Sequence, residues 1–310
     1  MDDGQLLSRA IKSRPGEWTL RLVYADWLQE NGQPERAELI RLSSPARPPP
    51  DESERDGRSK RVEQILRAED NFRSQLNATV LRVELRDGMP FLHLDIVNFF
   101  QHIEALLDAH PDIVGVKIVD DVRDGTLRDR LVRSPLLENF NHLTLTGLTD
   151  LRDDAVEALA GNQAVGRLTH LSLPDHEMSD AGARAIASSP HLRKLTSLSV
   201  RRGRMTGEGF VALSNGGYAA SLEELDFGFC CLTDEAVQSF VVDGSPLPYL
   251  KKLDLYGNWT TCDSFVSLAE SPRLPPETLL KVSGDNGRSF VGKVENLRAR
   301  TIRLGVGSSR

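Results

Sequence analysis

The chain has 310 residues, a formal net charge of −7 and 39% hydrophobic residues. This length allows one large or two modest domains, and the acidic balance argues against a dedicated nucleic-acid-binding protein, which should show a basic surface. The acidic start of the chain argues against a signal peptide, and no apolar run approaches the roughly 20 residues that span a bilayer. Three cysteines without a CxxC pair are typical of a reducing compartment, so we expect a cytoplasmic protein that does not contact membranes.

Residues 1–43 are predicted to form a small module of about three helices. Apolar residues recur at helical spacing in DDGQLLSRAIKS and in WTLRLVYADWLQENG. Gly32 and Pro34 stop and restart the chain, and PERAELIRL supplies the third helix. The positions expected to face the core are Leu6, Leu7, Ala10 and Ile11 in the first helix and Leu20, Val23, Tyr24, Trp27 and Leu28 in the second.

The string RLVYADWLQENGQPERAELIRL resembles the repeat-companion domain, a short bacterial module often joined to leucine-rich or other repeats, over most of residues 4–42. The resemblance implies a pairing of domains and no defined activity. It is carried by Arg21, Tyr24, Ala25, Asp26, Trp27, Leu28, Gly32, Arg36, Ala37, Glu38 and Arg41. We expect the charged residues Arg21, Asp26, Glu38 and Arg41 to form ion pairs between helices around Trp27, with a docking surface for a partner as the alternative.

A change of composition separates this module from the rest of the chain. Residues 44–60 are Pro-rich and charged, which predicts a flexible linker. Residues 61–112 are then expected to cap the repeats that follow, with a helix over RVEQILRAEDNFRSQL and a hairpin over VLRVELRDGMPFLHLDI that turns at Asp87 and Gly88. A hairpin there would cover the edge of the first repeat strand.

A unit of 27 or 28 residues repeats along the next part of the chain. Its pattern is LxxLxL, then a Ser or Thr, then a helical apolar pattern, and the clear copies start at Phe140, Leu168, Leu195, Leu222 and Leu250. A weaker copy starts at Ile113, and segments from Phe91 and Thr278 look like a first and a last unit. The LxL alternation predicts a strand with one apolar face.

The second half of each repeat is predicted to be a helix. Ser179, Thr206 and Thr233 stand where a helix N-cap is expected, each before an Asp or a Gly. One strand and one helix cannot bury both apolar faces alone, but stacked repeats can, with strands on one side and helices on the other.

The repeats resemble the leucine-rich-repeat family, in its helix-bearing, ribonuclease-inhibitor-like type. The resemblance covers residues 113–286 and implies an α/β solenoid, a right-handed horseshoe arc with parallel strands on the concave side and helices on the convex side. The family usually has Asn or Cys at the ninth position, where the side chain satisfies backbone groups of a turn. This chain has Leu148, His176, Gly203, Cys230 and Asn258 there.

That position also explains the adjacent cysteines. Cys230 occupies the turn slot, Cys231 follows it, and Cys262 falls at the start of the next helix. A structural role is therefore favoured over a metal or redox site.

Other chemical motifs are weak, and we expect no catalytic, cofactor or metal site. GRSFVGKV at 287–294 lacks the Ser or Thr that a phosphate-binding loop places after its lysine. His142 and His170 would be neighbours across two strands, and we interpret them as exposed surface histidines. Residues 287–310 are expected to cap the far end of the repeats.

The candidate binding surface lies on the strand side, where side chains between the leucines point away from the core. This surface is small and polar at first and gains charges and aromatic side chains later, and Arg and aromatic residues are the usual interface anchors. The candidate partner-binding residues are Arg201, Arg202, Asp226, Phe229, Asp254 and Tyr256, with a solvated face that binds nothing as the alternative.

These features predict a non-catalytic scaffold for protein–protein interaction, monomeric, with a protein partner of unknown identity and without nucleic acid. The alternative is a regulator of an enzyme or effector, in which the N-terminal helices act on a partner that the repeats recruit.

Overall fold

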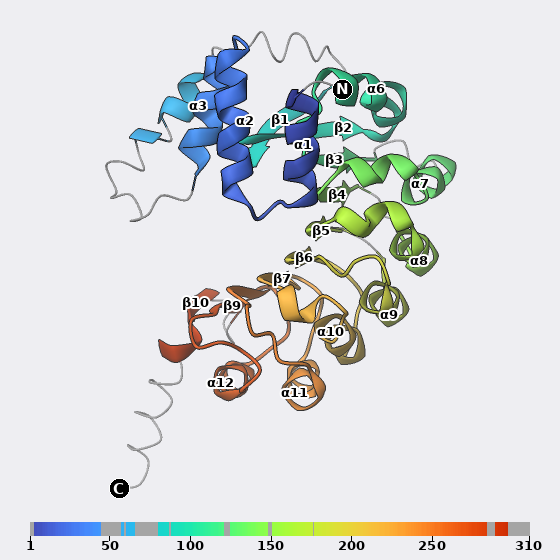
Figure 1. Ribbon diagram of the computed structural model, residues 1–310. Coiled ribbons are helices and arrows are strands. Elements are labelled where there is room, and N and C mark those ends of the chain that lie inside the picture. The colour runs from blue at the N-terminus through green and yellow to red at the C-terminus, as the bar shows by residue number, and fades with distance from the viewer. Residues whose placement is uncertain are drawn as a thin grey trace, which may run out of the picture. The chain divides into compact units, whose positions relative to one another are not determined.

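Figure 1 shows the protein as a computed structural model. It describes residues 3–44, 57–58, 60–65, 80–86, 88–120, 125–147, 151–175, 177–283 and 289–296, without the side chains of residues 262, 289 and 290. Residues 45–56 and 59 of the predicted linker, most of the helix expected after residue 61 and the tail beyond residue 296 lie outside the described residues. Residues 57–58 and 60, which were predicted to belong to the linker, are helical. The chain forms two compact units, Met1–Val119 with Asn139–His142, and Asp120–Glu138 with Leu143–Arg310. None of the described helices is long and apolar enough to cross a membrane.

The first unit begins with the three predicted helices, α1 (Asp3–Ser13), α2 (Trp18–Glu30) and α3 (Pro34–Ser43). Pro34 occupies the first turn of α3, where its missing N–H is not needed. The buried faces differ from the prediction at two positions, because Leu6 and Val23 are exposed. Asp26 and Arg41 form the expected ion pair between α2 and α3, at 2.7 Å, whereas Glu38 pairs with Arg61.

The helices share a core with the strands that follow them. Met89 and Val114 belong to the same cluster of buried side chains as Ile11, Leu28 and Ile40. Polar contacts reinforce this packing. The Ser8 hydroxyl donates to the carbonyl of Pro111, Arg36 pairs with Asp112, and the Asn141 amide donates to the carbonyl of Lys12. The helical module is therefore part of the first unit and shares its core with Met89 and Val114.

The predicted hairpin is confirmed as β1 (Arg82–Arg86) paired antiparallel with β2 (Met89–Asp95). Asp87 of its turn lies outside the described residues. Gly88 has a φ of +74° and packs against the backbone of Ile40, so a side chain there would be strained and would clash. Helix α6 (Ile96–Ala109) then leads to β3 (Gly115–Val119), which pairs parallel with β2.

The strands of the second unit follow the predicted repeat and lie in sequence order. Strand β4 is His142–Thr146, β5 is His170–Ser172, β6 is Ser197–Ser199, β7 is Glu224–Asp226, and β8 is Lys252–Leu255. From β5 to β8 the pairing is parallel, and the register aligns Leu171, Leu198, Leu225 and Leu253. The leucine slots recognised from spacing are therefore the aligned, buried positions of neighbouring strands.

Helices cover the other side of these strands, as Figure 1 shows for this unit. They are α7 (Gly125–Val132), α8 (Asp153–Gly161), α9 (Asp180–Ser188), α10 (Gly207–Ser214), α11 (Asp234–Asp243) and α12 (Cys262–Glu270). Short 3₁₀ turns, including η1 (Pro135–Asn139) and η2 (Gln163–Arg167), lead from a helix to the next strand. Phe210 packs within 5 Å of both Phe227 and Phe240, measured between ring centroids, so aromatic rings fill the space between the layers.

A carboxylate at the start of one helix caps the start of the next. Asp153 accepts hydrogen bonds from the hydroxyl and amide of Ser179, and Asp180 does the same for Thr206. The predicted N-caps at Ser179 and Thr206 are confirmed. Thr233 also occupies the predicted N-cap position, of helix α11, but its side chain makes no cap hydrogen bond.

The last repeat strand is closed by a hairpin. Strand β9 (Leu279–Ser283) pairs parallel with β8 and antiparallel with β10 (Ser289–Lys293). The register places Leu280 opposite Leu253 and Lys281 opposite Asp254. The last unit therefore starts one residue earlier than the sequence pattern suggested.

Candidate functional site

The eighth residue of every clear repeat, just after the strand, has a left-handed backbone. It is Gly147, Asp175, Arg202, Phe229 or Gly257, with φ between 58° and 78°. Glycine adopts this conformation without strain, whereas residues with a side chain do so at a cost of about 1–2 kcal/mol. The turn thus fixes the backbone, and the sequence decides which side chain it displays.

The side chain at the ninth position of the repeat hydrogen-bonds to backbone groups of the turn. The Asn258 side chain accepts hydrogen bonds from the amides of Cys230 and Leu232 and donates to the carbonyls of Phe227 and Leu255. In the preceding repeat, the buried Cys230 thiol lies 3.1 Å from the carbonyl of Val200. Burial raises the pKa of Cys230 to about 12, which supports the structural interpretation of this cysteine. Cys231 is free and exposed.

We call the six predicted binding residues, Arg201, Arg202, Asp226, Phe229, Asp254 and Tyr256, the strand-face patch. At its centre, the residue Phe229 is 38% exposed, and its ring meets the Tyr256 ring edge to face at a centroid distance of 5.4 Å. The guanidinium groups of Arg201 and Arg202 lie 5.4 and 5.7 Å from the centre of the Phe229 ring, within cation–π range.

Carboxylates anchor the basic side chains of this patch. Arg201 pairs with Asp226 at 3.0 Å and lies 3.8 Å from Asp254. Asp254 is only 3% exposed, so it supports the patch from beneath and cannot itself form much of a contact surface. Its other oxygen accepts the amide of Tyr256, which fixes the backbone below the aromatic pair.

The structure brings all six predicted residues together and adds two that the pattern missed. Lys281 pairs with Asp254 at 3.1 Å and lies over the Tyr256 ring, while Asp175 pairs with Arg202 at 2.6 Å. The correct register of the last unit would have revealed Lys281. Asp175 holds the same eighth position as Phe229, two repeats earlier, which is the signal that could have found it.

The interpretation of His142 as an exposed surface histidine was wrong. Its side chain packs against Phe91, with Gly115 directly beneath it, and the residue is only 6% exposed. The lack of a side chain at Gly115 creates the space that His142 fills. His170 is half-buried. Among the described residues, no three His, Cys, Asp or Glu side chains gather as a metal site would require.

A model of the leucine-rich-repeat family matches residues 168–187 and 218–241. An internalin from Listeria monocytogenes is structurally similar, with 13% sequence identity and a TM-score of 0.33, over 57% of this chain and 49% of the internalin, so this chain spans about half of that protein. The Rad7–Elc1 complex from yeast contains a chain with 15% identity and a TM-score of 0.40, over 84% of this chain and 70% of that one. None of the curated proteins matches this chain.

The family match falls on the repeats that start at Leu168 and Leu222, whose leucines the strand register aligns. Residues 168–187 and 218–241 are thus similar to leucine-rich repeats. The resemblance of residues 4–42 to the repeat-companion domain stays a prediction.

Proposed function

We propose that this protein is a non-catalytic scaffold that binds a protein partner through the strand-face patch. Leucine-rich repeats generally mediate protein–protein interaction, and the patch has the residue types of interface anchors. The observation that carries the proposal is Phe229, a bulky aromatic residue held half-exposed in a left-handed backbone conformation.

The choice of residue at this turn is informative. A glycine would fit the left-handed turn without strain, as Gly257 does in the next repeat. Phenylalanine accepts both the backbone strain and partial exposure of its ring. Strain that persists at a surface position supports a functional role for that side chain. The ion pairs around it hold the ring and its neighbours in place before a partner arrives, which reduces the entropy lost on binding.

The test is quantitative binding of a partner isolated with the full chain. Replacing Phe229 and Tyr256 by alanine should weaken binding by about 2 kcal/mol or more, since exposed aromatic anchors dominate interfaces. The matched control replaces Val242 and Tyr249, which are also exposed in this unit but lie off the patch. Equal binding by the two double variants would contradict the assignment of the patch.

A second candidate function rests on the N-terminal helices. A groove of about 450 Å³ lies against α1 and α2, lined by the apolar side chains of Leu6, Leu7, Val23 and Trp27 and by three acidic residues. Leu6 and Val23 are exposed there. This surface supports the alternative in which the helices act on a partner that the repeats recruit.

The full chain also tests this alternative, because the helices share a core with Met89 and do not form a separate body. Replacing Leu6 and Val23 by serine should abolish the effect on the recruited partner and leave its capture by the repeats intact. If the double variant keeps both the effect on the partner and the capture of the partner, the groove has no role in this function.

We further propose that the protein acts as a monomer in a reducing compartment such as the cytoplasm, which suits the free thiols of Cys230 and Cys231. Light scattering during gel filtration, with and without reductant, should give the monomer mass in both conditions.

A further inference from the structure

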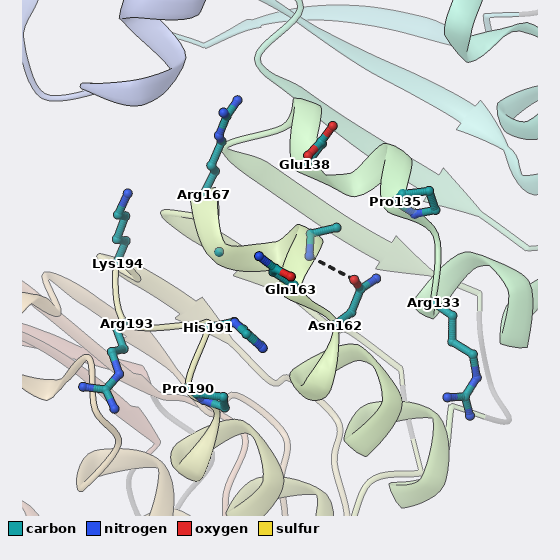
Figure 2. Close-up of a pocket in the computed structure, with 12 residues that line it drawn as sticks. Arg133, Pro135, Glu138, Asn162, Gln163, Arg167, Pro190, His191, Arg193 and Lys194 are labelled. Carbon is teal, nitrogen blue, oxygen red and sulfur yellow. Dashed lines mark hydrogen bonds between the residues drawn. The ribbon is translucent and has the colours of Figure 1, made fainter.

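A second charged surface lies in the repeats, away from the strand-face patch. It is a groove of about 720 Å³, which we call the basic groove (Figure 2). Among the described residues that line it, four are cationic at neutral pH and one is acidic. The charged and titratable residues that line it are Arg133, Arg167, His191, Arg193, Lys194 and Glu138. A protein with a net charge of −7 thus concentrates positive charge at one place.

Successive repeats build this groove from equivalent segments. Arg133 follows helix α7, Arg167 ends the 3₁₀ turn η2, and Arg193 precedes strand β6. Each segment leads from a helix to the next strand. The Asn162 amide donates to the carbonyls of Val132 and Ser134, so the floor of the groove is held by hydrogen bonds between neighbouring repeats.

Three of the four cations of the groove, Arg133, Arg193 and Lys194, differ from several exposed cations elsewhere in this unit. Those basic side chains pair with carboxylates, as in Arg152 with Glu177, Arg184 with Glu208, and Lys251 with Glu223. Among the residues that the structure describes, no carboxylate pairs with Arg133, Arg193 or Lys194. These side chains therefore retain their full capacity to bind an external anion.

We propose that the basic groove binds an extended polypeptide segment rich in Asp and Glu. Figure 2 shows Arg133 on one side of the groove and Arg167, Arg193 and Lys194 on the other, with Gln163 and His191 between them. Cations spread along a rim match a row of carboxylates better than a single anion. The guanidinium fork suits carboxylate geometry, and it gives charge-assisted hydrogen bonds.

The lining argues against single-stranded nucleic acid as the occupant. Proteins that bind such strands usually stack bases on aromatic side chains. The lining residues that the structure describes include no Phe, Tyr or Trp. The side chains beside the cations are those of Pro135, Pro190 and Gln163, which offer a stiff wall and an amide for a peptide backbone.

The test uses the full chain and a fluorescein-labelled peptide of ten glutamates, with a Gly-Ser peptide as the blank, followed by fluorescence anisotropy at low salt. Binding should be saturable and should weaken as salt is added. R193E/K194E should weaken binding by about tenfold or more, because two attractive contacts become repulsive. The control R184E/K251E changes the net charge equally, away from the groove, and should bind as the unchanged protein does.

Three outcomes would overturn the proposal. They are the absence of saturable binding, an equal loss in both double variants, and a single-stranded oligonucleotide of ten nucleotides that binds more tightly than the peptide. Thermal unfolding followed by circular dichroism establishes that each variant remains folded. Neither double variant changes a residue of the strand-face patch, so a difference between the two variants is independent of the function proposed above.

Discussion

At the scale of the residue, the eighth position of the repeat decides what the turn displays. The backbone there is left-handed whether the residue is Gly257, Arg202 or Phe229. Where glycine occupies the eighth position, as at Gly257, a neighbouring side chain can fill the space that a β-carbon would take. The Phe229 ring lies directly over Gly257, and a β-carbon added to Gly257 would clash with that ring.

Gly257→Ala should therefore destabilise the protein by about 1–3 kcal/mol, from backbone strain and from displacement of the Phe229 ring. Chemical denaturation measures the free energy of unfolding. The control is Gly161→Ala at the end of helix α8, where an added β-carbon has open space, and this change should be neutral or slightly stabilising. Equal effects of the two substitutions would show that the turn does not require glycine.

The two adjacent cysteines should differ sharply in reactivity. Burial raises the pKa of Cys230 to about 12, whereas Cys231 is exposed. Because the thiolate is the reactive form, iodoacetamide at pH 8 should label Cys231 at least about a hundredfold faster than Cys230 in the folded protein. Tandem mass spectrometry distinguishes the two positions. Similar rates at both cysteines would contradict the buried, structural role of Cys230.

At the scale of the element, carboxylates link the starts of successive helices. Asp153 accepts two hydrogen bonds from Ser179 and one from the amide of Gly182. Burial alone would raise the pKa of Asp153, but these hydrogen bonds outweigh it and hold the pKa below its ordinary value. Asp234 has the same balance, with hydrogen bonds from Ser264 and Thr261. Each bond joins one repeat to the next.

Asp153→Asn should lower the free energy of unfolding at pH 7 by about 1 kcal/mol, the usual value of a helix cap. A carboxylate with a lowered pKa in the folded state stabilises the fold above its unfolded pKa, and this contribution is lost as pH falls through the folded pKa. The unchanged protein should therefore lose more stability than the variant below about pH 4.

The matched control for this prediction is Asp154→Asn. Asp154 is exposed in the same first turn of helix α8, so it shares any interaction with the helix dipole. Denaturation curves at several pH values compare the two variants. Parallel stability profiles for Asp153→Asn and the control would contradict the capping role.

At the scale of the whole molecule, the described chain forms two compact units. In the first unit, helices α1 to α3 share a core with β2 and the segment before β3. Leu28 is fully buried in that core, and it lines a small space together with Leu85 and Pro90 of the hairpin. The helices and the hairpin should therefore lose structure together.

Leu28→Ala should destabilise the first unit by about 2–5 kcal/mol, the usual cost of a cavity in a core. Hydrogen exchange should accelerate in β2 and β3 as well as in the three helices. Leu22→Ala, an exposed leucine of the same helix, is the control and should change little. Faster exchange confined to the helices would show that they fold separately from the hairpin.

The sequence predicted the repeats well because their signal is local. The register of Leu171, Leu198, Leu225 and Leu253 follows from the same spacing of leucines, which occurs in each repeat. The same spacing placed Phe229 beside Tyr256. The sharing of a core between the helices and Met89 carries no such periodic signal, because it joins segments far apart in the chain.

The strand pattern did not predict the burial of Asp254 in the candidate site, for a similar reason. The alternation of the strand identified Asp254 as facing away from the core, but Asp254 is buried and pairs with the long side chains of Arg201 and Lys281. Long side chains can cover a polar surface from several repeats, and strand periodicity does not encode their direction. The burial of His142 likewise depends on the small size of Gly115 in another strand.

Photo-crosslinking tests the central claim, that Phe229 contacts a protein partner, most directly. A photoreactive phenylalanine analogue replaces Phe229 in one preparation of the full chain and exposed Val242 of helix α11 in another. Illumination in the presence of the isolated partner should give a crosslinked species from position 229 and little from position 242. Crosslinks from position 242 alone, or equal crosslinks from both, would contradict the account.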